Sequence, residues 1–346
     1  MVTIKQIAAE LGISATTVSI VLNGKSAERK ISDATQRKIF EAANRLGYQP
    51  NIAARSLRAG AGADELRIAM LWAEDFRASM MVRFWDGLRS ALLRLDRRVR
   101  LVIYPYTNDH LCDVHALTSA SDCHAAIICN ASNADLAFLR STQLAVPVVL
   151  YNRICQGYCS VNVDDAQMGA LAARALCDQN CRRGLVLTSA PVFDGMDLRV
   201  QSFLLEGSHH GLDSTVAEYC QNSVRGGYDA AYRLWADPAA RPDGLFCGSS
   251  RIAHGVLRAF RDLGLDMPQM PRVVAIGNSS PDFDELSVPS LSVVYLPMED
   301  MARECLGLLL DCMDGNLEKP ESRMLEVRYI SRESCGPLAA SPYITK

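Results

Sequence analysis

The sequence lacks several features that would place it in a specialised class of protein. No apolar run approaches the roughly 18–20 residues of a membrane helix, and the N-terminal stretch carries Lys5 and Glu10 where a signal peptide needs an apolar core. Charged residues make up 22% and apolar residues 49% of the chain, values that exclude disordered, collagen-like and coiled-coil proteins. For 346 residues we expect two or three domains. Because membrane and signal segments are missing, we expect the protein in the cytoplasm, without a membrane partner.

Motifs of the common enzyme classes are also missing. The sequence has no Gly-x-Ser-x-Gly, no Gly-x4-Gly-Lys-Ser/Thr, no His-Glu-x-x-His and no Gly-x-Gly-x-x-Gly. It therefore offers no nucleophile elbow, phosphate loop, zinc-binding helix or dinucleotide fingerprint. We predict a protein that is not an enzyme, with no catalytic residues and no cofactor.

Twelve cysteines are present, all beyond residue 111, but no Cys-x-x-Cys occurs. On a long chain without an export signal, they are expected to be reduced, mostly buried thiols. The residues nearest to a metal-ligand spacing are Cys155 with Cys159, Cys177 with Cys181, and the run of His110, Cys112 and His115. Because the other ligand types are scattered, we favour core and surface roles for these residues and expect no metal site.

Positive charge is concentrated in the first sixty residues. This segment carries nine Lys/Arg and four Asp/Glu, a net of +5, whereas the remainder carries 27 and 35, a net of −8. A small basic unit joined to a larger acidic body is typical of a nucleic-acid-binding module on a regulatory domain, because only the module has to neutralise phosphates.

The basic segment has the pattern of a helix-turn-helix. A capping box beginning at Thr3 predicts a first helix that Gly12 ends, and Ser14 can cap a second helix over 15–22. Small and hydroxyl residues begin the second helix, where a recognition helix meets base edges. A third helix is expected over 32–46. An ordinary antiparallel helix pair would show the same periodicity.

Four motifs in this segment are dense enough to indicate a family. They are Thr3-Ile4-Lys5-Gln6-Ile7-Ala8, Gly12-Ile13-Ser14 followed by Thr17-Val18-Ser19, Val21-Leu22-Asn23-Gly24, and Leu46-Gly47-Tyr48-x-Pro50-Asn51-x-Ala53-Ala54-Arg55-x-Leu57. With them the chain closely resembles the LacI (lactose repressor) family of bacterial transcription regulators. The resemblance implies that the second helix lies in the major groove. It also implies that the segment after Pro50-Asn51 folds into a hinge helix when two protomers sit on an operator.

The resemblance further implies which residues contact DNA. Leu57 would wedge between bases in the minor groove, beside basic residues that contact the narrowed groove or the phosphates. The expected DNA-binding residues are Thr3, Ser14, Ala15, Thr16, Thr17, Ile20, Asn23, Tyr48, Asn51, Ala54, Arg55, Leu57 and Arg58. Ile20 departs from the family, which usually has an arginine there that suits a bidentate contact with guanine. The operator is therefore expected to differ at that base pair.

From residue 66 onward, short β-rich runs alternate with helical ones, which predicts an α/β architecture with parallel sheets. The expected strands are 67–72, 100–104, 125–129, 146–150, 184–188, 244–247 and 273–276, and the expected helices are 84–95, 166–177, 200–209, 229–235 and 252–263. The family resemblance continues more diffusely to about residue 337, through motifs such as Ile252-Ala253-x-Gly255-Val256-Leu257. It is similar to the two-lobed, Rossmann-like periplasmic-binding-protein type I fold, which binds a small molecule in the cleft between its lobes.

These patterns divide the chain into four parts. We expect a helix-turn-helix headpiece at 1–49, a hinge helix and linker at 50–63, a two-lobed effector-binding and dimerisation domain at 64–340, and a tail at 341–346.

Candidate effector contacts follow from the position of polar residues at the carboxyl ends of the expected strands, where ligands of open α/β sheets bind. They are Trp72, Asp75, Asn130, Asn152, Arg153, Asp164, Arg199, Ser249, Ser250, Gly277 and Asn278. Met81 is added because its helical spacing with Trp85 is typical of a core or cleft wall. The resemblance places Arg199 at the family's ligand-binding arginine, whereas Ser249-Ser250 and Gly277-Asn278 stand where sugar-binding relatives commonly carry carboxylates. The loss of these acceptors argues against a common pentose or hexose, and the two arginines favour an acidic ligand.

The sequence thus predicts a transcriptional repressor whose affinity for operator DNA is set by a sugar-like or acidic small molecule. Its partners would be a pseudo-palindromic double-stranded operator, the effector and a second copy of the chain, in a homodimer or a tetramer. Two other functions share the fold: a solute-binding protein for transport, and a regulator that senses a partner protein instead of a metabolite.

Overall fold

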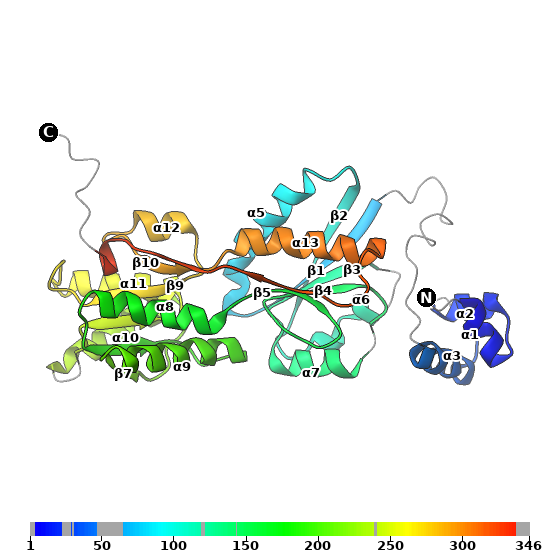
Figure 1. Cartoon of the computed structure of the whole chain (residues 1–346), viewed down its shortest axis with the longest axis horizontal. Helices are drawn as coiled ribbons and strands as arrows, with labels where there is room; N and C mark the ends of the chain where they lie inside the picture. The colour runs from blue at the N-terminus through cyan, green and yellow to red at the C-terminus, as the bar shows by residue number, and fades with distance from the viewer. Residues whose placement is uncertain are drawn as a thin grey trace. The chain divides into compact units, whose positions relative to one another are not determined.

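The computed structural model describes residues 4–22, 29, 31–46, 65–118, 122–142, 144–238 and 241–336. Figure 1 shows helices α1 to α3 near the N-terminus and, after them, strands that alternate with helices. The expected hinge helix at 50–63 and the expected tail at 341–346 lie outside the described residues. Among the helices of the described part, none combines the length and apolarity needed to cross a bilayer.

The headpiece, which comprises the described residues between 4 and 46, contains α1 (Ile4–Leu11), α2 (Ala15–Leu22) and α3 (Asp33–Leu46). Each helix contributes one apolar face to a common core, formed by Ile7, Ala8, Val18, Val21, Ile39, Ala42 and Ala43. The turn after α1 is left-handed at Gly12, with a φ of +64°. The Ile13 N–H donates to the Ala8 carbonyl at 3.1 Å, the arrangement of a Schellman C-cap. The predicted helix-turn-helix with a third helix is confirmed.

The described chain beyond the headpiece forms two sheets. Contacts divide the whole chain into two units. The first unit comprises Met1–Asp75, Leu88–Val161 and Ala302–Arg323, and the second comprises Phe76–Gly87, Asn162–Met301 and Met324–Lys346. The chain therefore passes between the units several times, as β5, α13 and β11 each contain residues of both.

The sheet of the first unit has the strand order β11-β5-β4-β3-β1-β2. Its strands are β1 (Glu65–Ala73), β2 (Arg98–Tyr106), β3 (Ala125–Cys129), β4 (Val148–Tyr151), β5 (Cys159–Val163) and β11 (Ser322–Leu325), and its sequence neighbours include α5 (Met81–Leu92), α6 (His115–Thr118), α7 (Asn133–Ser141) and α13 (Met298–Asp314). The pairs from β2 through β5 are parallel. Strand β3 is buried along its whole length, as is typical of parallel strands covered on both faces.

The sheet of the second unit has the strand order β12-β10-β9-β8-β6-β7. Its strands are β6 (Arg183–Leu187), β7 (Asp213–Val216), β8 (Gly244–Cys247), β9 (Arg272–Gly277), β10 (Ser292–Tyr295) and β12 (Arg328–Ile330), and its helices are α8 (Asp165–Asp178), α9 (Asp194–His209), α10 (Val224–Ala236), α11 (Ser250–Asp262) and α12 (Pro281–Leu286). Among the described strands of this sheet, β12 runs antiparallel to its neighbour β10, and the other pairs are parallel. Both orders reverse direction beside one strand, at β1 and at β6, which creates a topological switch point in each sheet.

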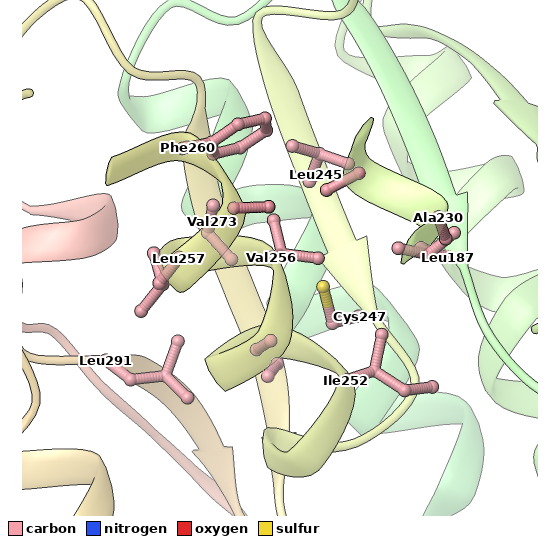
Figure 2. Close-up of a cluster of buried hydrophobic side chains, with 14 of the residues drawn as sticks. Leu187, Ala230, Leu245, Cys247, Ile252, Val256, Leu257, Phe260, Val273 and Leu291 are labelled. Carbon is pink, nitrogen blue, oxygen red and sulfur yellow. The ribbon is translucent and has the colours of Figure 1, made fainter. Parts of the chain in front are cut away.

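In the core of the second unit, apolar residues at helical spacing on α11 pack against the sheet. Ile252, Val256 and Phe260 recur at i, i+4 and i+8 on α11 and are fully buried. Figure 2 shows them packed toward Leu245 and Cys247 of β8. The apolar stripe of α11 therefore covers one face of the sheet, because this contact removes the apolar surfaces of both the helix and the sheet from water.

Glycines allow the helices of the second unit to approach closely. Figure 1 shows α8 beside α9 and α10 beside α11. A Cβ atom on Gly169 would lie 2.0 Å from the carbonyl oxygen of Arg199, and one on Gly255 would lie 2.0 Å from that of Val224. Larger residues would push these helix pairs apart, so Gly169 fixes the position of the helix that carries Arg199.

Candidate functional site

The start of α2 is held in place by a side-chain cap. The Thr17 N–H donates to the Ser14 Oγ at 3.0 Å, and the Ser14 and Thr17 hydroxyls are 2.8 Å apart. Ser14 therefore satisfies one of the free N–H groups at the helix terminus, as the sequence predicted. The buried pair Val18 and Val21 anchors the opposite face of the helix, so the first turn of α2 faces outward.

Five expected DNA-binding residues lie together on this outward part of the headpiece. Ser14 and Thr16 are exposed, while Ala15, Thr17 and Ile20 are partly exposed. Basic side chains that the sequence reasoning did not single out are also exposed on the headpiece: Lys5, Arg29, Arg37 and Lys38. The other expected contacts lie outside the described residues; they are Thr3, Asn23, Tyr48, Asn51, Ala54, Arg55, Leu57 and Arg58.

In the first unit, two asparagines end neighbouring parallel strands. Asn130 follows β3 and Asn152 follows β4, with φ of +64° and +51°. Asparagine is one of the few residues that adopt this left-handed conformation readily, which gives both positions a structural role that the sequence pattern did not reveal. Asn130 is 3% exposed, and its Nδ2 has no hydrogen-bond partner among the described residues. Asn130 also lies beside the switch point, where β3 pairs with β1.

The other candidates of the first unit are held close to the backbone. Trp72 is buried near the end of β1. Asp75, two residues after the last residue of that strand, is partly buried. The Arg153 guanidinium is also buried, and it donates from Nε to the Ala131 carbonyl and from Nη1 to the Asn152 carbonyl. The structure thus gives Arg153 protein acceptors, which weakens one support for the expected acidic ligand.

Arg199 of the second unit also has a protein partner. Its Nε donates to the Asp165 Oδ1 at 2.7 Å, its Nη2 lies 2.6 Å from the same oxygen, and its guanidinium carbon is 5.8 Å from the centre of the Phe193 ring. The neighbouring Asp164 is exposed, and its carboxylate caps α8 by accepting from the Gln167 N–H at 2.9 Å. Because Arg199 is already neutralised by Asp165, it is a weaker argument for an anionic ligand than the sequence suggested.

The strand ends of the second sheet are joined by a network of hydroxyls and amides. The Ser249 Oγ donates to the Asn222 Oδ1 at 2.7 Å and also accepts from the Ile252 N–H. The Ser250 hydroxyl lies within 3.1 Å of both the Ile276 carbonyl and an Asp284 oxygen, and its backbone N–H donates to the Asn278 Oδ1 at 3.2 Å. Ser250 is fully buried, so its hydroxyl stabilises the strand ends of this sheet through these hydrogen bonds.

Two further candidates lie at the ends of a strand and a helix. Gly277 is the last residue of β9, and its carbonyl accepts from the Arg83 Nη1 at 3.1 Å. Met81 is the first residue of α5 and is partly buried. The interlobe cleft expected from the resemblance stays a prediction.

Sequence reasoning missed Thr188 and Ser189, which directly follow β6 at the switch point of the second sheet. They are 5% and 7% exposed, and the Ser189 Oγ has no hydrogen-bond partner among the described residues. Their place immediately beyond a predicted strand was a usable signal. Buried hydroxyls of this kind are suited to holding a polar ligand, because an unpaired buried group is costly. No group of three or more His, Cys, Asp or Glu side chains with metal-binding geometry occurs in the described part of the chain.

Comparisons with known proteins agree with this architecture. A family model described as bacterial regulatory proteins, lacI family, matches residues 3–51, and a model described as periplasmic binding protein-like domain matches residues 173–335. A crystal structure of a LacI family transcription regulator from Clostridium acetobutylicum is 31% identical in sequence, with a TM-score of 0.73 over 78% of this chain and 100% of that chain. This chain belongs to the LacI family. The chain is therefore a DNA-binding transcriptional regulator.

Two further relatives have lower sequence identity but align with nearly the whole chain. The HTH-type transcriptional regulator AglR of Rhizobium meliloti (strain 1021) is 26% identical over 97% of this chain and 95% of its own length. The structure of a transcriptional regulator CelR–cellobiose complex is 22% identical, covers 96% of this chain and 100% of that chain, and has a TM-score of 0.65. CelR is in complex with cellobiose in that structure. At 22% identity, the similarity shows that the two chains share a fold.

Proposed function

We propose that this LacI-family chain is a repressor that binds a pseudo-palindromic operator as a homodimer and that a small molecule controls this binding. One observation carries the proposal: a capped helix with an outward, hydroxyl-rich first turn stands in the same chain as two α/β units with polar strand ends. Such a chain would act by binding rather than by catalysis. The domain limits we propose are 1–49 for the headpiece, 50–63 for the hinge and 64–340 for the effector-binding and dimerisation domain.

For the DNA contacts, the exposure of the first turn of α2 supports direct readout. Ser14, Thr16 and Thr17 offer hydroxyls to base edges or phosphates, while Ala15 and Ile20 offer apolar surface to a thymine methyl. The family resemblance adds Thr3, Asn23, Tyr48, Asn51, Ala54, Arg55, Leu57 and Arg58, with Leu57 as the minor-groove wedge. Two headpieces related by a two-fold axis would read two half-sites of one operator.

For the effector, the chemistry of the strand ends supports an uncharged, hydroxyl-bearing molecule. Arg153 and Arg199 already have protein acceptors, and two neutral buried groups just beyond the strand ends have no partner among the described residues, the amide Nδ2 of Asn130 and the hydroxyl of Ser189. Both groups can hydrogen-bond to the hydroxyls of an uncharged ligand. A sugar-like effector also agrees with the cellobiose complex of a relative.

The test uses the full-length protein in two steps. Genomic fragments are first incubated with the protein and the retained DNA is sequenced; we expect enrichment of sites with two-fold symmetry. A thermal-shift screen of neutral sugars, sugar phosphates, nucleobases and organic acids is then run, since a ligand stabilises the state that it binds. A neutral sugar that raises the unfolding temperature is expected to change operator affinity as well.

Two results would contradict the proposal. Ligand binding without any sequence-specific DNA retention would favour a solute-binding protein. Stabilisation by organic acids alone would contradict the uncharged effector.

A further inference from the structure

Two cysteines from distant parts of the sequence meet in the first unit. Cys159 is the first residue of β5 and Cys312 lies near the end of α13. The Cys312 thiol donates a hydrogen bond to the Cys159 Sγ, with the two sulfurs 3.4 Å apart. The backbone N–H of Glu321 donates to the same Cys159 sulfur at 3.3 Å. Neither cysteine is in a disulfide in this structure.

An arginine holds both cysteines in this arrangement. The Arg323 guanidinium donates to the Glu321 Oε1 at 2.8 Å and to the Asp311 Oδ2 at 3.2 Å. Glu321 is the residue whose N–H contacts Cys159, and Asp311 immediately precedes Cys312 in α13. Arg323 therefore joins the two segments that bring the sulfurs together, and it adds a positive charge close to them.

The same contacts favour the thiolate form of Cys159. The hydrogen bond from Cys312 lowers the pKa of the Cys159 thiol to about 6, against the opposing effect of burial, and the Glu321 N–H and the Arg323 charge act in the same direction as Cys312. The pKa of Cys312 is raised, chiefly by the same hydrogen bond. By contrast, burial raises the pKa of Cys123 to about 11 and that of Cys181 to about 12. Thiolate is the reactive form of cysteine, so Cys159 stands apart from these buried thiols.

The pairs that the sequence spacing suggested do not show this geometry. Cys155 and Cys159 are not on one helical turn, because Cys159 begins a strand. The Cys155 thiol lies 3.9 Å from the Leu136 carbonyl, and the Cys181 thiol lies 3.5 Å from the Asp243 carbonyl. These sulfurs are directed to backbone acceptors instead of to another sulfur.

We propose that Cys159 and Cys312 form a redox-active dithiol that a small hydroperoxide oxidises to an intrachain disulfide. The Cys159 thiolate attacks one oxygen of hydrogen peroxide, the O–O bond breaks, and hydroxide leaves and takes up a proton to become water. The Cys159 sulfenic acid is then attacked by the Cys312 sulfur, which loses its proton as the S–O bond breaks and a second water leaves. Two thiols lose two electrons and two protons in all, and one peroxide is reduced to two waters.

The geometry suits this sequence of steps. Cys159 is 5% exposed and Cys312 is partly exposed, so a reagent as small as hydrogen peroxide is the matching oxidant. The sulfurs have to approach from 3.4 Å to about 2.05 Å, the length of a disulfide bond. A low-pKa cysteine beside a resolving cysteine is the arrangement of a redox sensor. The resulting disulfide would fasten α13 to β5.

The experiment uses the reduced, full-length protein. It is treated briefly with a stoichiometric amount of hydrogen peroxide near neutral pH, the remaining thiols are alkylated, and the protein is digested without reductant for mass spectrometry. We expect a cross-linked peptide pair containing Cys159 and Cys312, a loss of two hydrogen atoms per chain, and full reversal by dithiothreitol. The exposed Cys112 provides the matched control, since Cys112→Ser should leave the cross-link unchanged.

Variants separate the two roles in the reaction. In Cys312→Ala, the Cys159 that reacts should stop at the sulfenic acid, which dimedone traps, whereas in Cys159→Ala the same dose should leave Cys312 unmodified. The wild-type cross-link is the primary readout, so the test holds even where a variant folds poorly. Oxidation confined to Cys112 or Cys177, a disulfide between other cysteines, or no reaction in the wild type would each overturn the proposal. None of these outcomes depends on the proposed repressor function.

Discussion

The Arg83 guanidinium and the Glu299 carboxylate form a bidentate ion pair, with Nε and Nη2 each 2.6 Å from one carboxylate oxygen. The remaining donors of Arg83 reach backbone carbonyls at the ends of β9 and β10, namely those of Gly277, Ser279 and Leu296. Arg83 is 5% exposed. One side chain on α5 thus fastens this helix to the strand ends of the second unit, where candidate effector contacts lie.

Replacing Arg83 with Met should therefore destabilise the second unit strongly. The substitution leaves the Glu299 carboxylate and several carbonyls without their donor, and breaking a buried pair in this way costs about 3–5 kcal/mol. Urea unfolding would measure the free energy change. The control is Arg225→Met, since Arg225 pairs with Asp229 on an exposed surface and such pairs contribute about 0.5 kcal/mol or less. Equal effects of the two substitutions would contradict a structural role for the Arg83 pair.

The same pair should make stability depend on pH in the acid range. Burial raises the pKa of Glu299, but the hydrogen bond and charge of Arg83 outweigh it, so the pKa lies below its ordinary value of 4.5. A depressed pKa in the folded state contributes stability that is complete above the unfolded value and is lost as pH falls through the folded value. Wild type should exceed Glu299→Gln in free energy of unfolding above pH 4.5, and the difference should shrink below it. A difference that is constant with pH would show that Glu299 does not titrate with unfolding.

Local signals explain which elements the sequence could predict. The second helix at 15–22 and the strands at 125–129 and 244–247 match α2, β3 and β8 end to end, because apolar period and flanking turn residues are written into neighbouring positions. Strand β7 was missed because it is a short edge strand, largely exposed, that lacks a buried run. Strands β10 and β12 and helix α13 were not predicted either.

The candidate sites show a different limit. No local pattern indicates a partner for Arg83, since Glu299 lies 216 positions away. Spacing suggested Cys155 for Cys159, although Cys312 is its neighbour in space. Arg199 lies inside α9, which begins at Asp194 and not after Arg199 as the expected helix at 200–209 implied, and its neutralisation by Asp165 depends on the packing of α8 against α9. Contacts of this kind depend on tertiary packing, which the spacing of apolar residues within one helix or strand does not predict.

Ile20 provides a test of base readout by α2. It is partly exposed near the outward turn of the helix and stands where the family usually has arginine. Ile20→Arg should move the preferred half-site toward guanine at one position, because arginine pairs with guanine in the major groove and each such contact discriminates by about 1–3 kcal/mol. Selection of bound sequences from a random library by both proteins would measure the change. Lys5→Arg, a change elsewhere on the headpiece, is the control and should leave the base preference as it is; identical preferences for wild type and Ile20→Arg would remove Ile20 from the interface.

Asn130 allows its backbone role to be separated from ligand binding. Glycine adopts the left-handed conformation seen there without strain, whereas alanine pays about 1–2 kcal/mol. Asn130→Gly should therefore keep more of the stability than Asn130→Ala, while both lose the amide and weaken binding of the sugar that gives the largest thermal shift with wild type. Titration of that sugar into both variants provides the measurement. Undiminished binding by either variant would mean that the Asn130 side chain is not an effector contact.

The reactivity of Cys159 should follow pH in a way that depends on Cys312. With its pKa lowered to about 6 by the Cys312 hydrogen bond, Cys159 is mostly thiolate at neutral pH, and its rate of reaction with hydrogen peroxide should fall only as pH drops through that value. Cys312→Ala removes the donor, so the midpoint of the rate profile should move up toward the ordinary value of 9.0. Rates are followed from about pH 5 to about pH 9 by mass spectrometry of the Cys159 peptide, with dimedone present to trap the sulfenic acid in the variant. A shared midpoint would mean that Cys312 does not activate Cys159.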